Sequence, residues 1–200
     1  MKRLLVATRN AGKLAELRDL LGALANELAL ETLDAHPEVG ELAETGDTFE
    51  ANARAKASAA ARASRLFALA EDSGLEVDAL GGAPGVRSAR YAGGHGDDPA
   101  NLAKLLRELG AARDRRARFV CVGALADPAG RIVAEARGAC EGAIALAPRG
   151  TNGFGYDPVF VPADRPDHTM AELSRHEKAA LSHRGRALRA LLPQLRSALC

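Results

Sequence analysis

One long hairpin constrains the possible fold more than any other feature of this sequence. Two segments with many apolar residues, 118–126 and 131–146, are separated by residues 127–130, which read DPAG. Proline presets one backbone angle and glycine tolerates unusual ones, so this segment favours a reversal of the chain between two strands. The pattern predicts a long antiparallel β-hairpin in the second half of the chain.

The first part of the chain alternates between strand and helix patterns. Residues 3–7 are predicted to form a short buried strand, residues 8–13 a polar turn, and residues 27–33 a second strand that leads into a loop. Between the two strands, apolar residues recur at the spacing of an α-helix. These residues are Leu14, Leu17, Leu20, Leu21 and Leu24.

Two capping-box patterns indicate the starts of further helices. Asp47 and Glu50 begin an alanine-rich run of high helix propensity over residues 48–67, and Ser174 with Glu177 marks a start near the C-terminus. Leucines at helical spacing predict two more helices. One starts at Asp98 and carries Leu102, Leu105, Leu106 and Leu109; the last carries Leu188, Leu191, Leu192 and Leu195, and Pro193 would kink it.

Glu71 and Asp72 are adjacent acids at the end of an apolar run. An unpaired ionised carboxylate that leaves water costs several kcal/mol, so such acids are normally hydrogen-bonded or bound to metal. Because a serine and a glycine follow, we expect both acids on a turn between short strands at 67–70 and 74–80, facing a cleft. Oxygen ligands without nearby Cys or His favour magnesium or manganese over zinc. The alternative is a pair of turn or capping acids without a metal.

The first strand-to-helix loop carries Thr8, Asn10 and Lys13. Free amides at the start of a helix attract anions, and these side chains add donors, so the loop is a candidate phosphate cradle. It is not a Walker A loop, because Ala7 replaces the first glycine and Leu14 the metal-binding Ser or Thr. The alternative is an ordinary turn with a solvated lysine.

Asn52 and Lys56 lie four residues apart and therefore on one face of the alanine-rich helix, and Glu44 lies in the turn before it. A lysine among alanines can reach inward. The alternative is a solvated surface helix, since long charged side chains usually reach water.

A glycine-rich loop, PRGTNGFGYDPVF over residues 148–160, contains Phe154 and Tyr156 in a chain with only 4% aromatic residues. Glycines allow close approach, and a nucleotide base that stacks on an aromatic ring gains roughly 1 to 3 kcal/mol. This loop is a candidate base-binding segment. The alternatives are aromatic residues that pack at the loop edge and an Asp157 that only shapes a turn.

Lys178, His183 and Arg184 form a basic cluster around Ser182, which is placed to cap the last helix. Cations in the first turn of a helix oppose its dipole, so an anion or a recognition role would offset the cost. The alternative is an exposed basic turn. The remaining histidines, His36, His95, His168 and His176, lack metal-ligand spacing and are predicted to lie on the surface or in loops.

Composition limits the possible classes of protein. A hydrophobic content of 47% and the absence of a Ser, Pro or Gly-rich linker predict a single domain, 1–200, forming one compact unit. A formal net charge of +1 without a basic stripe argues against a nucleic acid partner, so an anionic ligand must be bound locally. Three widely spaced cysteines suggest packing residues in a reducing compartment. Without a signal peptide or a long apolar segment, we expect a soluble, cytoplasmic protein with no membrane partner.

Five segments together resemble the inosine triphosphate pyrophosphatase family, which hydrolyses nonstandard purine nucleoside triphosphates. They are LLVATRNAGKLAEL, ETGDTFEANARAKA, EDSGLEVDALGGAPGVRSARYAG, GFGYDPVF and AELSRHEKAALSHRGRAL. The match covers nearly the whole chain, in the order of the family. It implies a mixed α/β fold with an elongated central sheet flanked by helices, two lobes around a nucleotide cleft, a magnesium cofactor that manganese could replace, and a homodimer.

The resemblance also assigns roles by position. Glu44 and Asp72 would bind the metal, Asp72 would accept the proton of the attacking water, and Lys56 would assist at the phosphates. The substrate-binding residues would be Thr8, Arg9, Asn10, Ala11, Gly12, Lys13, Ser73, Phe154, Gly155, Tyr156, Asp157, Lys178, His183 and Arg184. Two positions depart from the family pattern: Arg9 replaces a common small residue, and Glu71 replaces the first of two aspartates, which leaves its share in metal binding open.

The hypothesis from sequence is hydrolysis of ITP, dITP or XTP to the monophosphate and pyrophosphate. Lysines and a metal would neutralise the charge of a triphosphate on a nearly neutral protein. One alternative is a Maf-like pyrophosphatase for modified pyrimidine or guanine nucleotides, against which the SHR and GYDP segments argue. The other is a nucleotide-sensing module without turnover.

Overall fold

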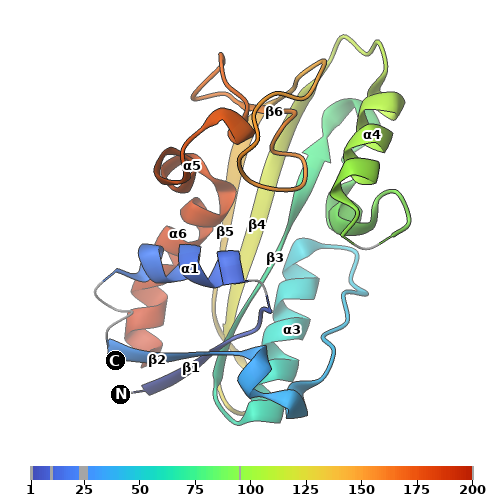
Figure 1. The fold of residues 1–200 in the computed structure, drawn as a ribbon. Helices are drawn as coiled ribbons and strands as arrows, with labels where there is room; N and C mark the ends of the chain where they lie inside the picture. Colours follow the sequence, from blue (N-terminus) through green and yellow to red (C-terminus); the bar gives the residue numbers. More distant parts are fainter. Residues whose placement is uncertain (1, 10, 23–26, 95, 200) are drawn as a thin grey trace. The chain divides into compact units, whose positions relative to one another are not determined.

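The computed structural model describes residues 2–9, 11–22, 27–94 and 96–199, with the backbone alone at residues 11–13, 16 and 20. A six-stranded sheet with the order β2-β1-β3-β4-β5-β6 organises the chain (Figure 1). Its strands are β1 (Lys2–Val6), β2 (Leu28–Thr32), β3 (Phe67–Val77), β4 (Arg116–Ala126), β5 (Ile132–Ile144) and β6 (Phe160–Pro162). The α-helices are α1 (Ala11–Leu21), α3 (Phe49–Ser64), α4 (Asp98–Leu109), α5 (Arg175–Leu181) and α6 (His183–Leu199).

The sheet combines parallel and antiparallel pairs. β1 runs parallel to both β2 and β3, with Leu4 opposite Leu30 and Phe67, whereas β5 and β6 are antiparallel. Parallel neighbours need crossover connections, which α1 and α3 supply. Between β4 and β5 the chain reverses tightly, and the Asp127 amide donates to the Arg131 carbonyl at 2.9 Å. The mixed α/β fold and the long hairpin are therefore both confirmed.

The chain divides into two compact units, each made of several segments. Unit 1 comprises Met1–Asp72, Cys121–Gly138 and Ala187–Cys200, and unit 2 comprises Ser73–Val120 and Ala139–Arg186. The boundaries fall inside β3, β4, β5 and α6 rather than in linkers. The single domain spanning 1–200 stays a prediction.

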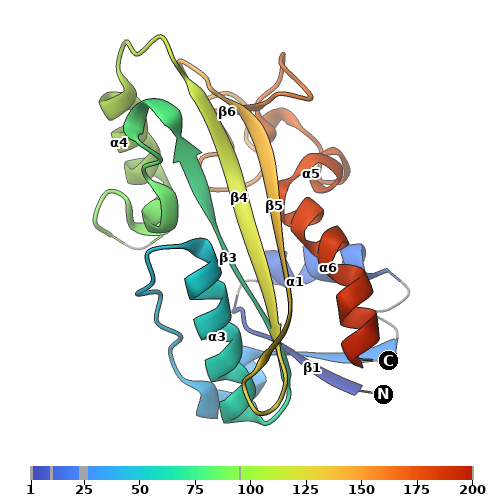
Figure 2. The same cartoon turned by 180° about the vertical axis from the view of Figure 1, so that it is seen from behind.

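In unit 1, α1 and α6 share a core with alternate residues of the strands. Leu17 and Leu21 of α1 and Leu191 of α6 pack in one cluster with Leu4 and Leu69. Because neighbouring strand residues point to opposite faces, Ala68 and Ala70, both buried, point away from that cluster. Figures 1 and 2 show α3 and α6 on opposite sides of the strands. The even-numbered residues at the start of β3 therefore face α3.

Unit 2 has its own core beneath α4. Leu105 and Leu109 of α4 pack with Leu75 of β3, Phe119 of β4 and Phe160 of β6. The leucines whose helical spacing predicted this helix therefore lie on its buried face. Among the residues that the structure describes, no helix is long and apolar enough to cross a membrane.

The predicted acidic turn is wrong, because β3 runs without interruption from Phe67 to Val77. Glu71 and Asp72 lie inside this strand, so their side chains point to opposite faces. The serine and glycine after them continue the strand; glycine tolerates unusual backbone angles but does not require them.

The start of α3 differs by one residue from the prediction. Thr48, not Asp47, is the N-cap, and its hydroxyl accepts from the Ala51 amide at 3.1 Å. The second predicted capping box is confirmed: Ser174 and Glu177 each accept a backbone hydrogen bond at the start of α5.

His36 lies in a loop between two 3-10 turns, one of the two places predicted for it, and there it is buried rather than on the surface. Its Nδ1 is 2.8 Å from Glu38 Oε1 and its Nε2 is 2.7 Å from Glu31 Oε2. The two carboxylates together raise the pKa of His36, Glu38 contributing most through its hydrogen bond.

Candidate active site

Glu44, Asn52, Lys56 and Asp72 form a cluster in unit 1, which we call the carboxylate–lysine cluster. Lys56 Nζ donates to Glu44 Oε1 at 2.5 Å and to Asp72 Oδ1 at 3.1 Å. Asn52 Nδ2 donates to the other Asp72 oxygen at 3.0 Å. The i, i+4 spacing on α3 thus brings an amide and an ammonium to one strand residue. The inward-reaching lysine is confirmed, and the solvated-helix alternative is excluded.

The loop before α3 is held against the same cluster. Asn52 Oδ1 accepts from the Gly46 amide at 2.7 Å, so this side chain bridges the loop and β3. A side chain at Gly46 would place its Cβ 2.8 Å from that oxygen, which explains the glycine. Because Glu44 lies two residues before Gly46, this hydrogen bond from Gly46 to Asn52 also helps to fix the backbone that carries Glu44.

Burial raises the pKa of Asp72. The ammonium of Lys56 opposes this shift, while the charge of Glu44 adds to it. The result is a carboxylate that takes up a proton more readily than an exposed aspartate, as a general base requires. Two carboxylates of the cluster thus share one ammonium.

The donor set, two carboxylates, is of the kind that magnesium prefers. Glu44 and Asp72 present carboxylate oxygens to one common point, now the lysine ammonium. Among the described residues, no group of three or more His, Cys, Asp and Glu residues could hold a metal. Magnesium often uses one or two carboxylates and completes its shell with water and phosphate oxygens. Two acids are therefore sufficient.

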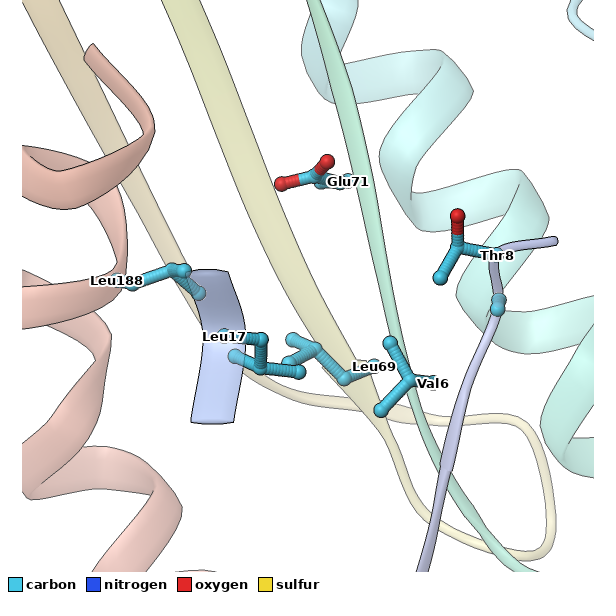
Figure 3. A pocket seen from close by; sticks show the side chains of 7 residues that line it. Val6, Thr8, Leu17, Leu69, Glu71 and Leu188 are labelled. Carbon is cyan, nitrogen blue, oxygen red and sulfur yellow. The ribbon is translucent and has the colours of Figure 1, made fainter. Parts of the chain in front are cut away.

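Glu71 lies on the other face of β3 and is not part of this cluster. It accepts a long contact from the Cys121 thiol, with Sγ 3.7 Å from Oε2, and borders an apolar pocket (Figure 3). Thr8 borders the same pocket. The pocket is lined by Val6, Ala7, Thr8, Leu17, Leu69, Glu71 and Leu188. Glu71 and Asp72, although adjacent in sequence, thus lie in two different environments.

Much of the predicted phosphate loop is outside the structure's description. Thr8 is half-buried, and Arg9 is exposed. Asn10 lies outside the described residues, as do the side chains of Ala11, Gly12 and Lys13, whose backbone begins α1. The phosphate cradle stays a prediction.

A second group of predicted residues gathers in unit 2, and we call Phe154, Asp157, Lys178 and Arg184 the aromatic–lysine cluster. Asp157 Oδ2 accepts from Lys178 Nζ at 2.5 Å and from the Phe154 amide at 2.8 Å. Lys178 Nζ and Arg184 Cζ lie 4.9 and 6.0 Å from the centre of the Phe154 ring. Phe154 itself is 51% exposed, so its ring is open to a ligand.

The charged members of this cluster are largely buried. Asp157 is 3% exposed and Arg184 is also 3% exposed. Burial raises the pKa of Asp157, and Lys178 opposes that shift. The Asp157 carboxylate therefore does more than shape a turn: it joins the loop to α5.

The other predicted residues of unit 2 have different surroundings. Tyr156 is in the core, and its hydroxyl donates to the Ser88 carbonyl at 2.8 Å. His183 is buried and stacks on Phe119, with ring centres 4.8 Å apart. Ser182 accepts from the Gly185 amide at 3.0 Å, which confirms its predicted cap of α6. Ser73 follows Asp72 in β3 but points to the opposite face.

Fold and site together define a mixed α/β protein with carboxylate, lysine and aromatic side chains gathered in two clusters. A sequence model of the Ham1 family matches residues 4–194. The chain belongs to the Ham1 family, which confirms the resemblance found in the five segments.

Relatives match over the full length. A Streptomyces avermitilis protein named dITP/XTP pyrophosphatase is 51% identical, and the match covers 100% of each chain. A protein of the same name from Mycobacterium tuberculosis is 54% identical and covers 98% of this chain and 96% of its own. Ham1 protein structures from Coxiella burnetii and Staphylococcus aureus have TM-scores of 0.90 and 0.89, with 43% and 40% identity. Both matches cover 98% of this chain and 100% of the other.

Proposed function

We propose that this protein hydrolyses nonstandard purine nucleoside triphosphates, namely ITP, dITP and XTP, to the nucleoside monophosphate and pyrophosphate. The observation that carries the proposal is the convergence of Glu44 and Asp72 on one cation position. The names of the relatives, dITP/XTP pyrophosphatase, support the choice of substrate.

The carboxylate–lysine cluster would act on the phosphates. Glu44 and Asp72 would hold a magnesium ion, which when bound neutralises charge on the phosphate oxygens. This ion would add two positive charges beside the Lys56 ammonium, which suits an anionic substrate. Lys56 would remain within reach of the phosphates, as a compact cation that needs no fixed bonding plane.

Asp72 would accept the proton of the attacking water. In this step the water oxygen forms a bond to phosphorus, the bond to the pyrophosphate leaving group breaks, and the proton passes to the carboxylate. Asn52 and Lys56 hold both Asp72 oxygens and thereby fix the direction of the carboxylate. The raised pKa of Asp72 supports this role.

The aromatic–lysine cluster would recognise the base. Phe154 would stack on the purine, and Lys178, His183 and Arg184 would offer donors to the 6-carbonyl that hypoxanthine and xanthine share. Adenine has an amine at this position and would leave those donors mismatched. A polar mismatch of this kind can discriminate by about 10⁴-fold.

Pyrophosphate release from dITP, XTP, dATP and dGTP with magnesium tests the proposal. Rapid release from dITP and XTP with little from dATP is the result that 6-carbonyl recognition predicts, and the dGTP arm shows whether the base site also rejects a 2-amino group. Release from modified pyrimidine or guanine nucleotides instead would favour a Maf-like enzyme, and tight binding of dITP without release would favour a sensor. Omitting magnesium, or replacing it with manganese, tests the cofactor in the same assay.

The family resemblance also supports two further proposals: the protein forms a homodimer, and it is located in the cytoplasm. Sedimentation of the purified protein tests the former, because a monomer of 20.9 kDa and its dimer differ twofold in mass. Fractionation of the source cells tests the latter.

A further inference from the structure

The loop that carries Phe154 depends on contacts outside the core for its shape. Gly150, Gly153 and Gly155 have φ values of +80°, +81° and +62°, a region that few other residues adopt readily. Phe154 between them is half exposed, with the Lys178 ammonium and the Arg184 guanidinium beside its ring. Contacts to the backbone decide where this side chain starts and which way it points.

Two carboxylates from distant parts of the chain hold the peptide groups on either side of Phe154. Asp157 Oδ2 accepts from the Phe154 amide at 2.8 Å. Asp98 Oδ2, at the start of α4, accepts from the Gly155 amide at 2.7 Å. The first peptide group precedes the Cα of Phe154 and the second follows it. Both backbone angles of Phe154 are therefore restrained, and with them the direction in which its side chain leaves the backbone.

The contact from Asp98 is not needed to cap its helix. The N-cap of α4 is Asp97, whose Oδ1 accepts from the Ala100 amide at 3.0 Å. The helix is anchored independently, because Leu105 and Leu109 are buried in the core of unit 2. Two adjacent aspartates thus have separate tasks: Asp97 caps the start of the helix, and Asp98 reaches the loop, 57 residues away in sequence.

We propose that Asp98 is a positioning residue that holds Phe154 in place to stack on the purine base. Asp98 lies with Phe154 and Gly155 on the border of one groove in unit 2. It acts through the backbone of Gly155 and does not need to touch the substrate. This inference rests on the proposed function, since stacking presupposes a nucleotide, but the anchoring of the loop can be measured without one.

Substituting Asp98 with alanine should weaken base binding more than chemistry. We expect KM for dITP to rise about tenfold while kcat changes less than threefold, because one hydrogen bond to a charged acceptor is lost. Asp98→Asn keeps an acceptor oxygen and should recover most of the loss. Asp97→Ala is the matched control: it removes the helix cap, so it should lower thermal stability but leave KM for dITP unchanged.

A tryptophan in the loop provides the readout that needs no substrate. The chain contains no tryptophan, so Phe154→Trp introduces a single fluorophore. In this background Asp98→Ala should increase the acrylamide quenching constant and lower the fluorescence anisotropy, whereas Asp97→Ala should change neither.

The two readouts separate failure of this inference from failure of the proposed function. Unchanged quenching and an unchanged KM in Asp98→Ala would overturn the positioning role, as would equal effects of Asp97→Ala and Asp98→Ala. If the parent protein released no pyrophosphate from any nucleotide, the proposed function would fail, while the quenching measurement would still decide whether Asp98 holds the loop.

Discussion

Replacing Lys56 with methionine should destabilise the protein in a way that magnesium corrects. The side chain of Lys56 is 9% exposed, and that of its partner Asp72 is 8% exposed. Methionine keeps most of the aliphatic length but removes the ammonium, so two carboxylates lose the cation between them. Glu44 is 27% exposed, and water can partly solvate it again.

The size of the effect follows from this burial. Breaking a buried ion pair by removing one partner costs about 3 to 5 kcal/mol. Because Glu44 regains water, we expect the lower end, about 3 kcal/mol. The loss should shrink as the pH falls, since burial raises the pKa of Asp72 and a protonated Asp72 no longer carries a charge without its cation.

Urea unfolding of wild type and Lys56→Met, with chelator and with magnesium, measures both the loss of stability and its correction by magnesium. Magnesium at ten times its dissociation constant should restore about 1.4 kcal/mol to the variant. Lys104→Met is the control, because the Lys104 side chain is 30% exposed, and besides its 3.7 Å contact with Glu108 it contacts the carbonyl and the ring of Tyr91. It leaves no buried carboxylate without its cation, so it should lose less than Lys56→Met and gain nothing from magnesium.

Two results would refute the reasoning. A loss in Lys56→Met as small as that in Lys104→Met would show that the ion pair is not effectively buried. A variant that magnesium does not stabilise would show that Glu44 and Asp72 do not form a cation site.

Three further outcomes are expected. His36→Asn should cost the most stability below about pH 6.5 and progressively less as the pH rises through the raised pKa of His36, because only the imidazolium donates to both carboxylates; urea unfolding at about pH 6 and about pH 9 checks this, and a constant difference would contradict it. Gly153→Ala should raise KM for dITP at least about tenfold, since its Cβ would lie 2.1 Å from Asp157 Oδ2 at a φ of +81°; steady-state kinetics showing a wild-type KM would argue against it. Thr48→Ala should lower the free energy of unfolding by about 1 kcal/mol through loss of the α3 cap, with kcat/KM unchanged; an equal unfolding midpoint would disprove the capping role.

Local patterns in the sequence predicted the elements well where the signal was periodic. The i, i+4 spacing of Asn52 and Lys56 and the capping box at Ser174 depend only on helix geometry, and the structure has both. The leucine stripe of α4 is buried as expected. In these cases the local sequence alone determines the structure, because the interacting residues lie within a few positions of one another.

The failures arose where distant segments decide the outcome. Glu71 and Asp72 looked like turn residues, but pairing with neighbouring strands carries β3 through them, and the strand period then separates the two acids. Tyr156 packs in the core with residues far away in the sequence, and its contact with the base stays a prediction. The Asp98 contact to Gly155 was missed, because no local pattern links residues 57 positions apart.

The most direct test of the account is pyrophosphate release from dITP by Asp72→Asn compared with wild type, at saturating magnesium and with equal unfolding midpoints. Loss of the proton acceptor should reduce kcat by about 10² to 10⁴-fold. A rate near that of wild type in a folded Asp72→Asn protein would contradict the claim that this carboxylate performs the hydrolysis.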